Sequence, residues 1–407
     1  MANTLLTPTA VTRESLRVLH QKLNFVGNIN RQYDDSFANS GAEIGSLLKI
    51  RLPNQYVVRN GATLAAQDTP EQSVSLNVTT QKGVDLNFSS VDLTMSLDDF
   101  SKRIINPAMS VLAASIEADA FNMALDVYNN VANIGNPITM NKLLSGRKVL
   151  NDNLTPIDNK RKAILNTQDN VDLIDALKGL FQDSDAIGEQ YKEGMMGRTA
   201  GFDFYENTLI PAQATGTAVT VTTYTVSGAS QTGNSLAVTS GGSTTFSKGD
   251  IITIANVNRV HPETKADTGV PQQFVVTANY AGGAGNLLVS PAIIPSTGIP
   301  AATPPVGAGS QNVTGSPASG AAISKVGTAG TTYKPSLLFH EDAFTFATAD
   351  LQMPQGVDFA ARQVMDGISM RIVRQYDINN DKFPTRVDVL YGYQTIRPQL
   401  ACRLLNN

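Results

Sequence analysis

The stretch Ala212–Ser247, AQATGTAVTVTTYTVSGASQTGNSLAVTSGGSTTFS, has no charged residue and consists mainly of Thr, Ser, Gly, Val and Ala. It opens a longer block, Ala212–Lys334, that holds only eight charged residues, whereas the other 58 lie outside it. Denser sequence flanks the block: GFDFYENTLIP (201–211) precedes it and PSLLFHEDAF (335–344) follows it. The simplest interpretation is a β-rich module inserted into a host domain.

Short apolar runs inside the block predict strands. They begin at Ile251, Phe274 and Leu287, each after turn-rich sequence. Strands of this length and spacing favour a small barrel or sandwich. Residues 296–330 are mainly Pro, Gly, Ser and Ala. We therefore expect a loop or flexible tail there, because the segment is too poor in apolar side chains to form a core.

Upstream of the block, the apolar periodicity predicts an arm, a hairpin and a long helix. Residues 12–26 form an amphipathic pattern bounded by breakers, so we expect a helical arm that docks on another surface, such as that of another subunit. From Leu48 to Met95 the period changes to two, and Arg59-Asn60-Gly61 marks a tight turn between strands. The strongest helix is predicted over 107–132, after Asn106 as N-cap.

The segments on both sides of the block predict one α+β domain. Before the block, helices or strands are predicted at 140–150, 161–165, 167–181 and from Phe202. After the block, strands are predicted at 343–347, 368–376 and 386–393. The last two should pair across the Asp377–Pro384 turn, and strands linked by short helices indicate the α+β class.

Composition excludes several classes of protein. The net charge of −4 argues against tight, general nucleic-acid binding, which needs concentrated Lys and Arg. Cys402 is the only cysteine, so no disulfide can form within the chain. The first residues lack the basic region of a secretory signal, and no stretch approaches the ~20 apolar residues of a spanning helix. We expect a protein of aqueous surroundings with no membrane partner.

No constellation of residues predicts catalysis, a cofactor or a metal. The sequence has no Gly-Lys dipeptide for a phosphate-binding loop and no Gly-x-Ser-x-Gly elbow. His20, His261 and His340 are far apart and lack metal-binding spacing. Cys402 lies among apolar residues, which does not favour a nucleophile. We therefore predict that the chain is not an enzyme.

Two short motifs imitate binding sites and are better interpreted as turns. Asp377 and Asn379 begin a series like a calcium loop, but Lys382 stands where such a loop needs Gly, and Pro384 follows. A hairpin turn explains these residues better. Lys248-Gly-Asp250 resembles an integrin-type tripeptide, and its place before a strand favours a structural turn.

The candidate site residues are the charged residues of the predicted hairpin. They carry both signs, and they could belong either to a solvated surface or to a contact with a neighbouring subunit in which complementary charges fix the register. A long strand pair is unstable alone, which favours the subunit contact. These residues are Lys49, Arg51, Arg59, Asp68 and Glu71.

The order of elements resembles a tailed-phage major capsid protein of the Hong Kong 97-type fold. More specifically, it is similar to the P22-type coat proteins of short-tailed phages, which carry an inserted β-barrel. The local matches are Ala200-Gly-Phe-Asp203, Leu209-Ile-Pro211, Lys248-Gly-Asp-Ile-Ile-Thr-Ile254, Phe274-Val-Val, Leu288-Val-Ser-Pro291, Tyr391-Gly392 and Arg397-Pro398.

The resemblance implies a role for each segment. Residues 1–43 would be an N-arm and 44–75 an extended E-loop that reaches over a neighbouring subunit. The remaining assignments are a peripheral domain at 76–137 with its spine helix at 107–132, closing strands of that domain at 376–407, an axial domain at 138–211 and 335–375, and the inserted barrel with a flexible tail at 212–334.

The function implied is a major capsid protein that self-assembles, as hexamers and pentamers, into the icosahedral shell around the phage genome. Implied partners are a scaffolding protein, a portal, a decoration protein and loosely contacted double-stranded DNA, with assembly in the host cytoplasm. Two alternatives are an encapsulin-like compartment shell and a β-rich decoration or tail module that binds glycans. The glycan module would need aromatic platforms, yet the block has five aromatic residues and the chain has no Trp.

Overall fold

The computed structural model describes residues 12–17, 19, 23–31, 47–58, 61–64, 66, 71–89, 104–177, 197–239, 242–296, 308–365, 368–379 and 382–406. Contacts divide the chain into two compact units. Unit 1 comprises residues 1–50, 75–121 and 344–396, and unit 2 comprises 51–74, 122–343 and 397–407.

Unit 1 is built on an antiparallel sheet whose central strand is β20 (Lys382–Thr395). On one side β20 pairs with β3 (Thr80–Ser89) from Lys382 to Tyr391. It also pairs with β19 (Ile368–Arg374), which pairs with β18 (Phe359–Met365), and with β17 (Phe344–Ala349). The predicted pairing of the strands at 368–376 and 386–393 is therefore confirmed.

The helix α4 (Asn106–Phe121) forms the other layer of unit 1 and packs against β3. Met109, Leu112 and Ile116 are each about 1% exposed, which is the buried stripe that the sequence predicts. The helix is shorter than the predicted 107–132, because the chain tightens into a 3-10 helix at Asn122–Asp126 and then enters β4 (Asn130–Ala132). Asn129 donates side-chain hydrogen bonds to the carbonyls of Gln399 (3.2 Å) and Ala401 (2.9 Å), which holds this extended segment.

By length and composition alone, the segment Asn106–Asp126 would be apolar enough to cross a membrane, contrary to the sequence expectation. More than half of its apolar window is buried inside the protein, as in the core helix of a soluble protein. This feature is therefore weak evidence for a membrane span.

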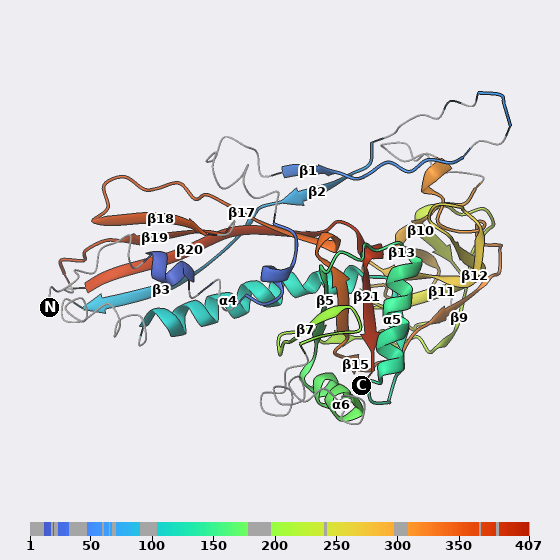
Figure 1. Cartoon of the computed structure of the whole chain (residues 1–407), viewed down its shortest axis with the longest axis horizontal. Helices are drawn as coiled ribbons and strands as arrows, with labels where there is room; N and C mark the ends of the chain where they lie inside the picture. The colour runs from blue at the N-terminus through green and yellow to red at the C-terminus, as the bar shows by residue number, and fades with distance from the viewer. Residues whose placement is uncertain are drawn as a thin grey trace. The chain divides into compact units, whose positions relative to one another are not determined.

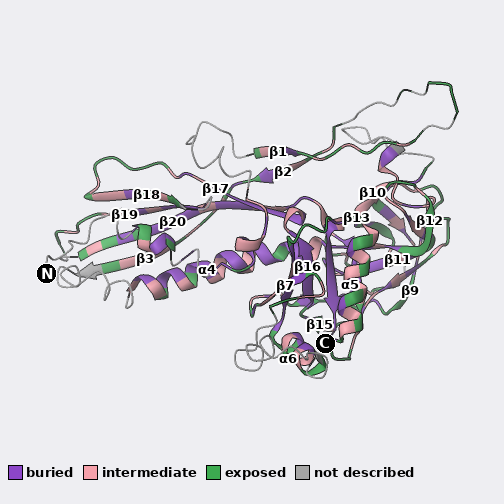
Figure 2. Ribbon diagram, viewed as in Figure 1, coloured by how far each residue is buried: buried purple, intermediate pink, exposed green. Residues whose placement is uncertain are grey.

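Unit 2 contains the host sheet, six strands in the order β4-β21-β16-β5-β7-β6. Their bounds are Ala401–Leu405 (β21), Ser336–His340 (β16), Arg161–Leu165 (β5), Phe202–Glu206 (β7) and Arg198–Thr199 (β6). Figure 1 shows α5 (Met140–Asp152) beside β21, and α6 (Thr167–Leu177) follows β5 in the chain. β16 and β21 are buried along their whole length, as Figure 2 shows.

The sheets correct two predicted segment boundaries. Within 335–375, only β16 pairs with β5, whereas β17, β18 and β19 belong to the unit 1 sheet. The chain leaves the host sheet at His340 because a single 3-10 turn, Glu341–Ala343, separates β16 from β17. Within 376–407, β20 lies in the unit 1 sheet but β21 lies between β4 and β16 of the host sheet.

The insertion (212–334) has its own core within unit 2. Six strands pair in the order β10-β13-β12-β11-β14-β9, and two end strands are also joined by Thr239 N–H to Thr225 O (2.8 Å) and Ser227 N–H to Ala237 O (2.9 Å). The strands are Val221–Thr225 (β9), Gly233–Val238 (β10), Ile251–Val260 (β11), Asp267–Val276 (β12), Gly285–Ile293 (β13) and Ala322–Lys325 (β14). A two-stranded stem, β8 (Gln213–Ala214) with β15 (Thr332–Tyr333), connects the entering and leaving chains.

The predicted flexible tail at 296–330 is wrong for its described part, residues 308–330. β14 belongs to the six-stranded sheet of the insertion, and Ile323 and Val313 are at most 1% exposed in its core. The segment needs few apolar residues because its backbone is held by hydrogen bonds to β11, such as Thr314 N–H to Asn258 O (3.0 Å).

Candidate functional site

The predicted hairpin is present as β1 (Leu47–Arg51) paired with β2 (Ser73–Asn77). The name "hairpin" is used below for residues 47–77. Ile50 and Leu76 are at most 2% exposed, while Lys49 and Arg51 on the alternate positions are exposed. This is the alternation expected of a sheet with one covered face.

Three of the five predicted site residues lie in the described part, and two of these three are in contact. Arg51 and Glu71 form an ion pair of 3.3 Å, with side chains 76% and 59% exposed. Exposed pairs of this kind contribute about 0–1 kcal/mol to stability, so the two charges are not required for folding. Arg59 and Asp68 lie outside the described residues.

The hairpin also carries exposed apolar side chains that the sequence reasoning passed over. Tyr56 is 55% exposed, Val58 87% and Leu64 82%. Their signal in the sequence was present: Tyr56, Val57, Val58 and Leu64 stand in a largely polar region between two strands. Patches of exposed apolar groups are typical of surfaces that contact another protein.

The arm segment (12–31) docks on its own chain in unit 1. Leu16, Leu19 and Leu23 are at most 5% exposed, and Phe25 stacks on Phe121 of α4 with ring centroids 4.4 Å apart. Asn30 continues the docking by accepting from Phe346 N–H and donating to Phe344 O of β17 (3.1 and 3.2 Å).

Glu117 of α4 anchors the arm by charge. Its carboxylate is 1% exposed and accepts from the backbone N–H groups of Asn24, Phe25 (2.7 Å) and Val26 (3.1 Å). Burial raises the pKa of Glu117, and these N–H donors offset only part of that effect. The prediction of an arm that docks is confirmed, with the partner surface in the same chain.

A second buried charged group, the junction cluster, fixes the insertion to the host sheet. It consists of Gln213, Gly249, Asp250, Lys325 and Arg403. Arg403 of β21 donates to Gln213 Oε1 (2.8 Å) and to the Gly249 carbonyl (2.9 Å). Because the guanidinium is 1% exposed, burial lowers the pKa of Arg403 to about 10.

Asp250 completes the junction cluster from inside the insertion. Its Oδ2 accepts from Gly216 N–H (3.0 Å) and Ser247 N–H (2.9 Å), while Lys325 Nζ donates to the Gly216 carbonyl (2.8 Å). Burial raises the pKa of Asp250 and lowers the pKa of Lys325. The structural interpretation of Lys248-Gly-Asp250 is therefore confirmed, with Lys248 paired to Asp126 at 3.5 Å.

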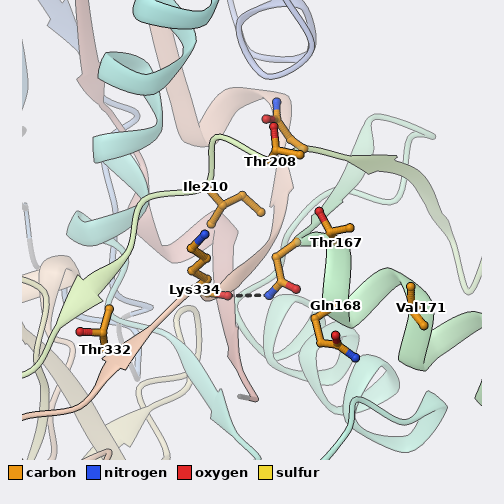
Figure 3. Close-up of a pocket in the computed structure, with 9 residues that line it drawn as sticks. Thr167, Gln168, Val171, Thr208, Ile210, Thr332 and Lys334 are labelled. Atoms are coloured by element: carbon orange, nitrogen blue, oxygen red, sulfur yellow. Dashed lines mark hydrogen bonds between the residues drawn. The ribbon is translucent and has the colours of Figure 1, made fainter.

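A pocket of about 610 Å³ lies where the insertion leaves the host sheet. Figure 3 shows Thr167, Gln168 and Val171 from α6, Thr208 and Ile210 from the entering chain, and Thr332 and Lys334 from the leaving chain. Asn166 donates to the Lys334 carbonyl (2.7 Å). Lys334 is the only charged side chain among these lining residues, so the pocket holds no acid–base pair.

His340 and Cys402, side chains that could bind a metal or act as a nucleophile, are buried in the fold. No group of His, Cys, Asp and Glu able to hold a metal occurs within the described parts of the chain. His340 is 1% exposed between Asp158 (3.0 Å) and the N–H of Asp342 (3.2 Å). Burial raises the pKa of Cys402 to about 12, which leaves an inert thiol.

The region that imitates a calcium loop is the turn between β19 and β20. Asp377 and Lys382 form an isolated antiparallel bridge, and Asp377 Oδ1 accepts from Asn379 N–H (3.0 Å). This is the local side-chain hydrogen bond of an Asx turn. The interpretation of Asp377 and Asn379 as part of a turn between two paired strands is therefore confirmed.

Comparison with known proteins identifies the family. The sequence matches the family described as "P22 coat protein - gene protein 5" over residues 28–405. No curated protein sequence matches the chain.

Among solved structures, the chain is similar to Mycobacterium phage Che8 (11% identity, 94% of this chain and 90% of that chain covered, TM-score 0.44). It is also similar to a virus-like particle from Pyrococcus furiosus (8% identity, 97% of each chain, TM-score 0.36). The CUS-3 coat protein I-domain matches at 28% identity over 26% of this chain and 95% of that domain, with TM-score 0.19.

The family match spans nearly the whole chain. The chain belongs to the P22 coat protein family and is a major capsid protein.

Proposed function

We propose that this major capsid protein forms its icosahedral shell through contacts of the hairpin, as an E-loop, with neighbouring copies of the same chain. The observation that carries the proposal is the exposure of the hairpin's charged and apolar side chains, Arg51, Glu71, Tyr56, Val58 and Leu64. A two-stranded sheet is marginal alone, so these side chains should gain their main contacts in the shell.

The expected contacts are individually weak and numerous. Exposed ion pairs such as Arg51–Glu71 contribute little each, yet they can fix register and reject a wrong neighbour. Weak contacts allow misplaced subunits to dissociate, whereas many simultaneous contacts make the closed shell durable. Lys49, Arg59 and Asp68 belong to the same proposed surface.

The other assigned roles are part of the proposal. The host sheet of unit 2 would be the axial domain, unit 1 the peripheral domain with α4 as spine, and the six-stranded sheet in 212–334 the inserted barrel. A scaffolding protein, a portal, a decoration protein and loosely held double-stranded DNA are the proposed partners, with assembly in the host cytoplasm.

The test is charge reversal on the hairpin. We expect Arg51→Glu to reduce the yield of closed shells seen by negative-stain microscopy, because it reverses a charge that is proposed to face a neighbouring copy. Glu263→Arg, on an exposed residue of the insertion, is the matched control and should leave the yield unchanged.

Two outcomes would contradict the proposal. One is wild-type protein that stays monomeric both alone and with a scaffolding protein. The other is an Arg51→Glu variant that forms shells as well as the Glu263→Arg control.

A further inference from the structure

The insertion meets the hairpin at Gly309, inside unit 2. Gly309 is buried, and a Cβ placed on it would lie 2.2 Å from the carbonyl oxygen of Gln55, 2.4 Å from its carbonyl carbon and 2.8 Å from Tyr56 N. A residue with a side chain at position 309 would therefore place its Cβ against backbone atoms, which cannot rotate away. In Figure 1 the short orange turn that contains Gly309 lies beside the blue chain of the hairpin.

The turn that carries Gly309 belongs to a firmly held segment. Asn312 N–H donates to Ile294 O (3.0 Å), and its side chain donates to Ala292 O (2.6 Å) and accepts from Ile294 N–H (3.0 Å). Val313, one residue on, is fully buried in the core of the insertion. These bonds attach the chain just after the turn to the end of β13.

The insertion is in turn fixed to the host sheet. The junction cluster joins the insertion to β21 through Arg403, which bonds both Gln213 and the Gly249 carbonyl inside the core. Within unit 2 the insertion thus meets β21 at the junction cluster and meets the backbone of Gln55 at Gly309.

We propose that the insertion positions the hairpin, with the Ala308–Ser310 turn as the docking surface for residues 54–56 of the same chain. The hairpin's two strands cannot set its direction, because a two-stranded sheet is flexible about its base. Docking at Gly309 removes this freedom before a neighbouring copy binds, which lowers the entropy lost on assembly. The consequence for shells rests on the proposed function of the hairpin, but the docking itself does not.

The experiment measures the docking in the unassembled full-length chain. Tyr56→Cys with Ser310→Cys places one thiol on each side of the contact, and buried Cys402 should not compete for the reagent. We expect a short bismaleimide to cross-link this pair efficiently. The control pair, Tyr56→Cys with Ala229→Cys in the turn between β9 and β10, should give at least several-fold less product.

Glycine substitutions then test the contact itself. Added to the first cysteine pair, Gly309→Ala should reduce cross-linking several-fold. In the chain without the two introduced cysteines, Gly309→Ala should lower the yield of closed shells. Gly315→Ala is the matched control, because a Cβ at Gly315 meets no atom within 4 Å. Amide hydrogen exchange of Ile251–Val260, unchanged in both variants, shows that the insertion is folded.

Equal cross-linking of the two cysteine pairs would overturn the proposal, even if Gly309→Ala failed to fold. Equal cross-linking in the Gly309→Ala and Gly315→Ala variants would also overturn it. A wild-type chain that cross-links as expected but forms no shells would support the docking and contradict the proposed function, so the two failures are distinguishable.

Discussion

The hairpin and the junction cluster use charged residues in opposite ways. Arg51 and Glu71 lie 3.3 Å apart with side chains mostly exposed, whereas Arg403 is 1% exposed and bonds an amide oxygen and a carbonyl inside the protein. A charged group exposed to water contributes little to the stability of the fold and stays available to another molecule. Removal of a buried charged group costs more stability, because its hydrogen-bond partners are left unsatisfied inside the protein.

The difference also changes the meaning of the charge-poor block. Two of its eight charged residues, Asp250 and Lys325, are at most 1% exposed and support the attachment of the insertion. These two charges therefore serve a structural role inside the protein. The contrast between the hairpin and the junction cluster can be tested by three substitutions and one pH titration.

The largest effect is expected for Arg403→Met. The variant keeps an apolar stem but leaves Gln213 and the Gly249 carbonyl without their buried donor. We expect a loss of about 3–5 kcal/mol in the free energy of unfolding, measured by chemical denaturation of the full chain. A loss below about 1 kcal/mol would show that the junction cluster tolerates the loss of a charged residue as well as the hairpin does.

The next largest effect is expected for Gly249→Ala. Gly249 has φ +93, and a Cβ would lie 3.2 Å from Gln213 Cδ and 3.3 Å from Leu125 Cδ2. Strain of this kind costs about 1–3 kcal/mol. Gly233→Ala is the control, because Gly233 has φ +85 but no atom within 4 Å of the added Cβ. Equal losses in thermal unfolding would mean that the junction contacts add nothing to the strain.

A smaller effect concerns the pH dependence of stability at Asp250. Its folded-state pKa is raised by burial, so the folded chain holds this proton at pH values where the unfolded chain has lost it. The stabilisation is complete below the unfolded value of about 3.9 and is lost as pH rises through the folded value. Relative to Asp250→Asn, the wild type should lose free energy of unfolding from about pH 4 upward. Parallel curves for the two proteins would contradict this.

The smallest effect on folding is expected for Arg51→Ala. Removal of an exposed ion pair should change the free energy of unfolding of the unassembled chain by about 0–1 kcal/mol. The same substitution should still reduce shell formation, measured by sedimentation, because the side chain is proposed to act between copies. A folding loss as large as that of Arg403→Met would remove the distinction between the two regions.

The elements with strong local signals were predictable from the sequence. β5 and β7 follow from short apolar runs, and α5 follows from helical spacing between turn residues. β9 and β10 were not predicted, because their Thr- and Ser-rich strands bury single residues such as Tyr224 and Leu236 rather than an apolar run. β14 was assigned to a loop for the same reason, since Ile323 is its one large core residue.

The candidate hairpin was predictable, but the junction cluster was not. Alternation at Leu48, Ile50 and Leu52 is a local pattern that identifies a strand from its own residues. Arg403 and Gln213 are 190 positions apart, and nothing near either residue indicates the other. Buried polar pairs depend on which strands the fold brings together, so they require the tertiary structure.

The place of β21 has a consequence for the order of folding. This strand lies between β4 and β16, so neither of these can complete its pairing until β21 arrives. The contact between Asn129 and Ala401 closes a loop of 272 positions, and closure of such long loops slows folding. Until then the edge of β16 is open to strands of other molecules, which favours aggregation. We therefore expect this chain to fold slowly and to benefit from a chaperone, with β21 as the last strand to join.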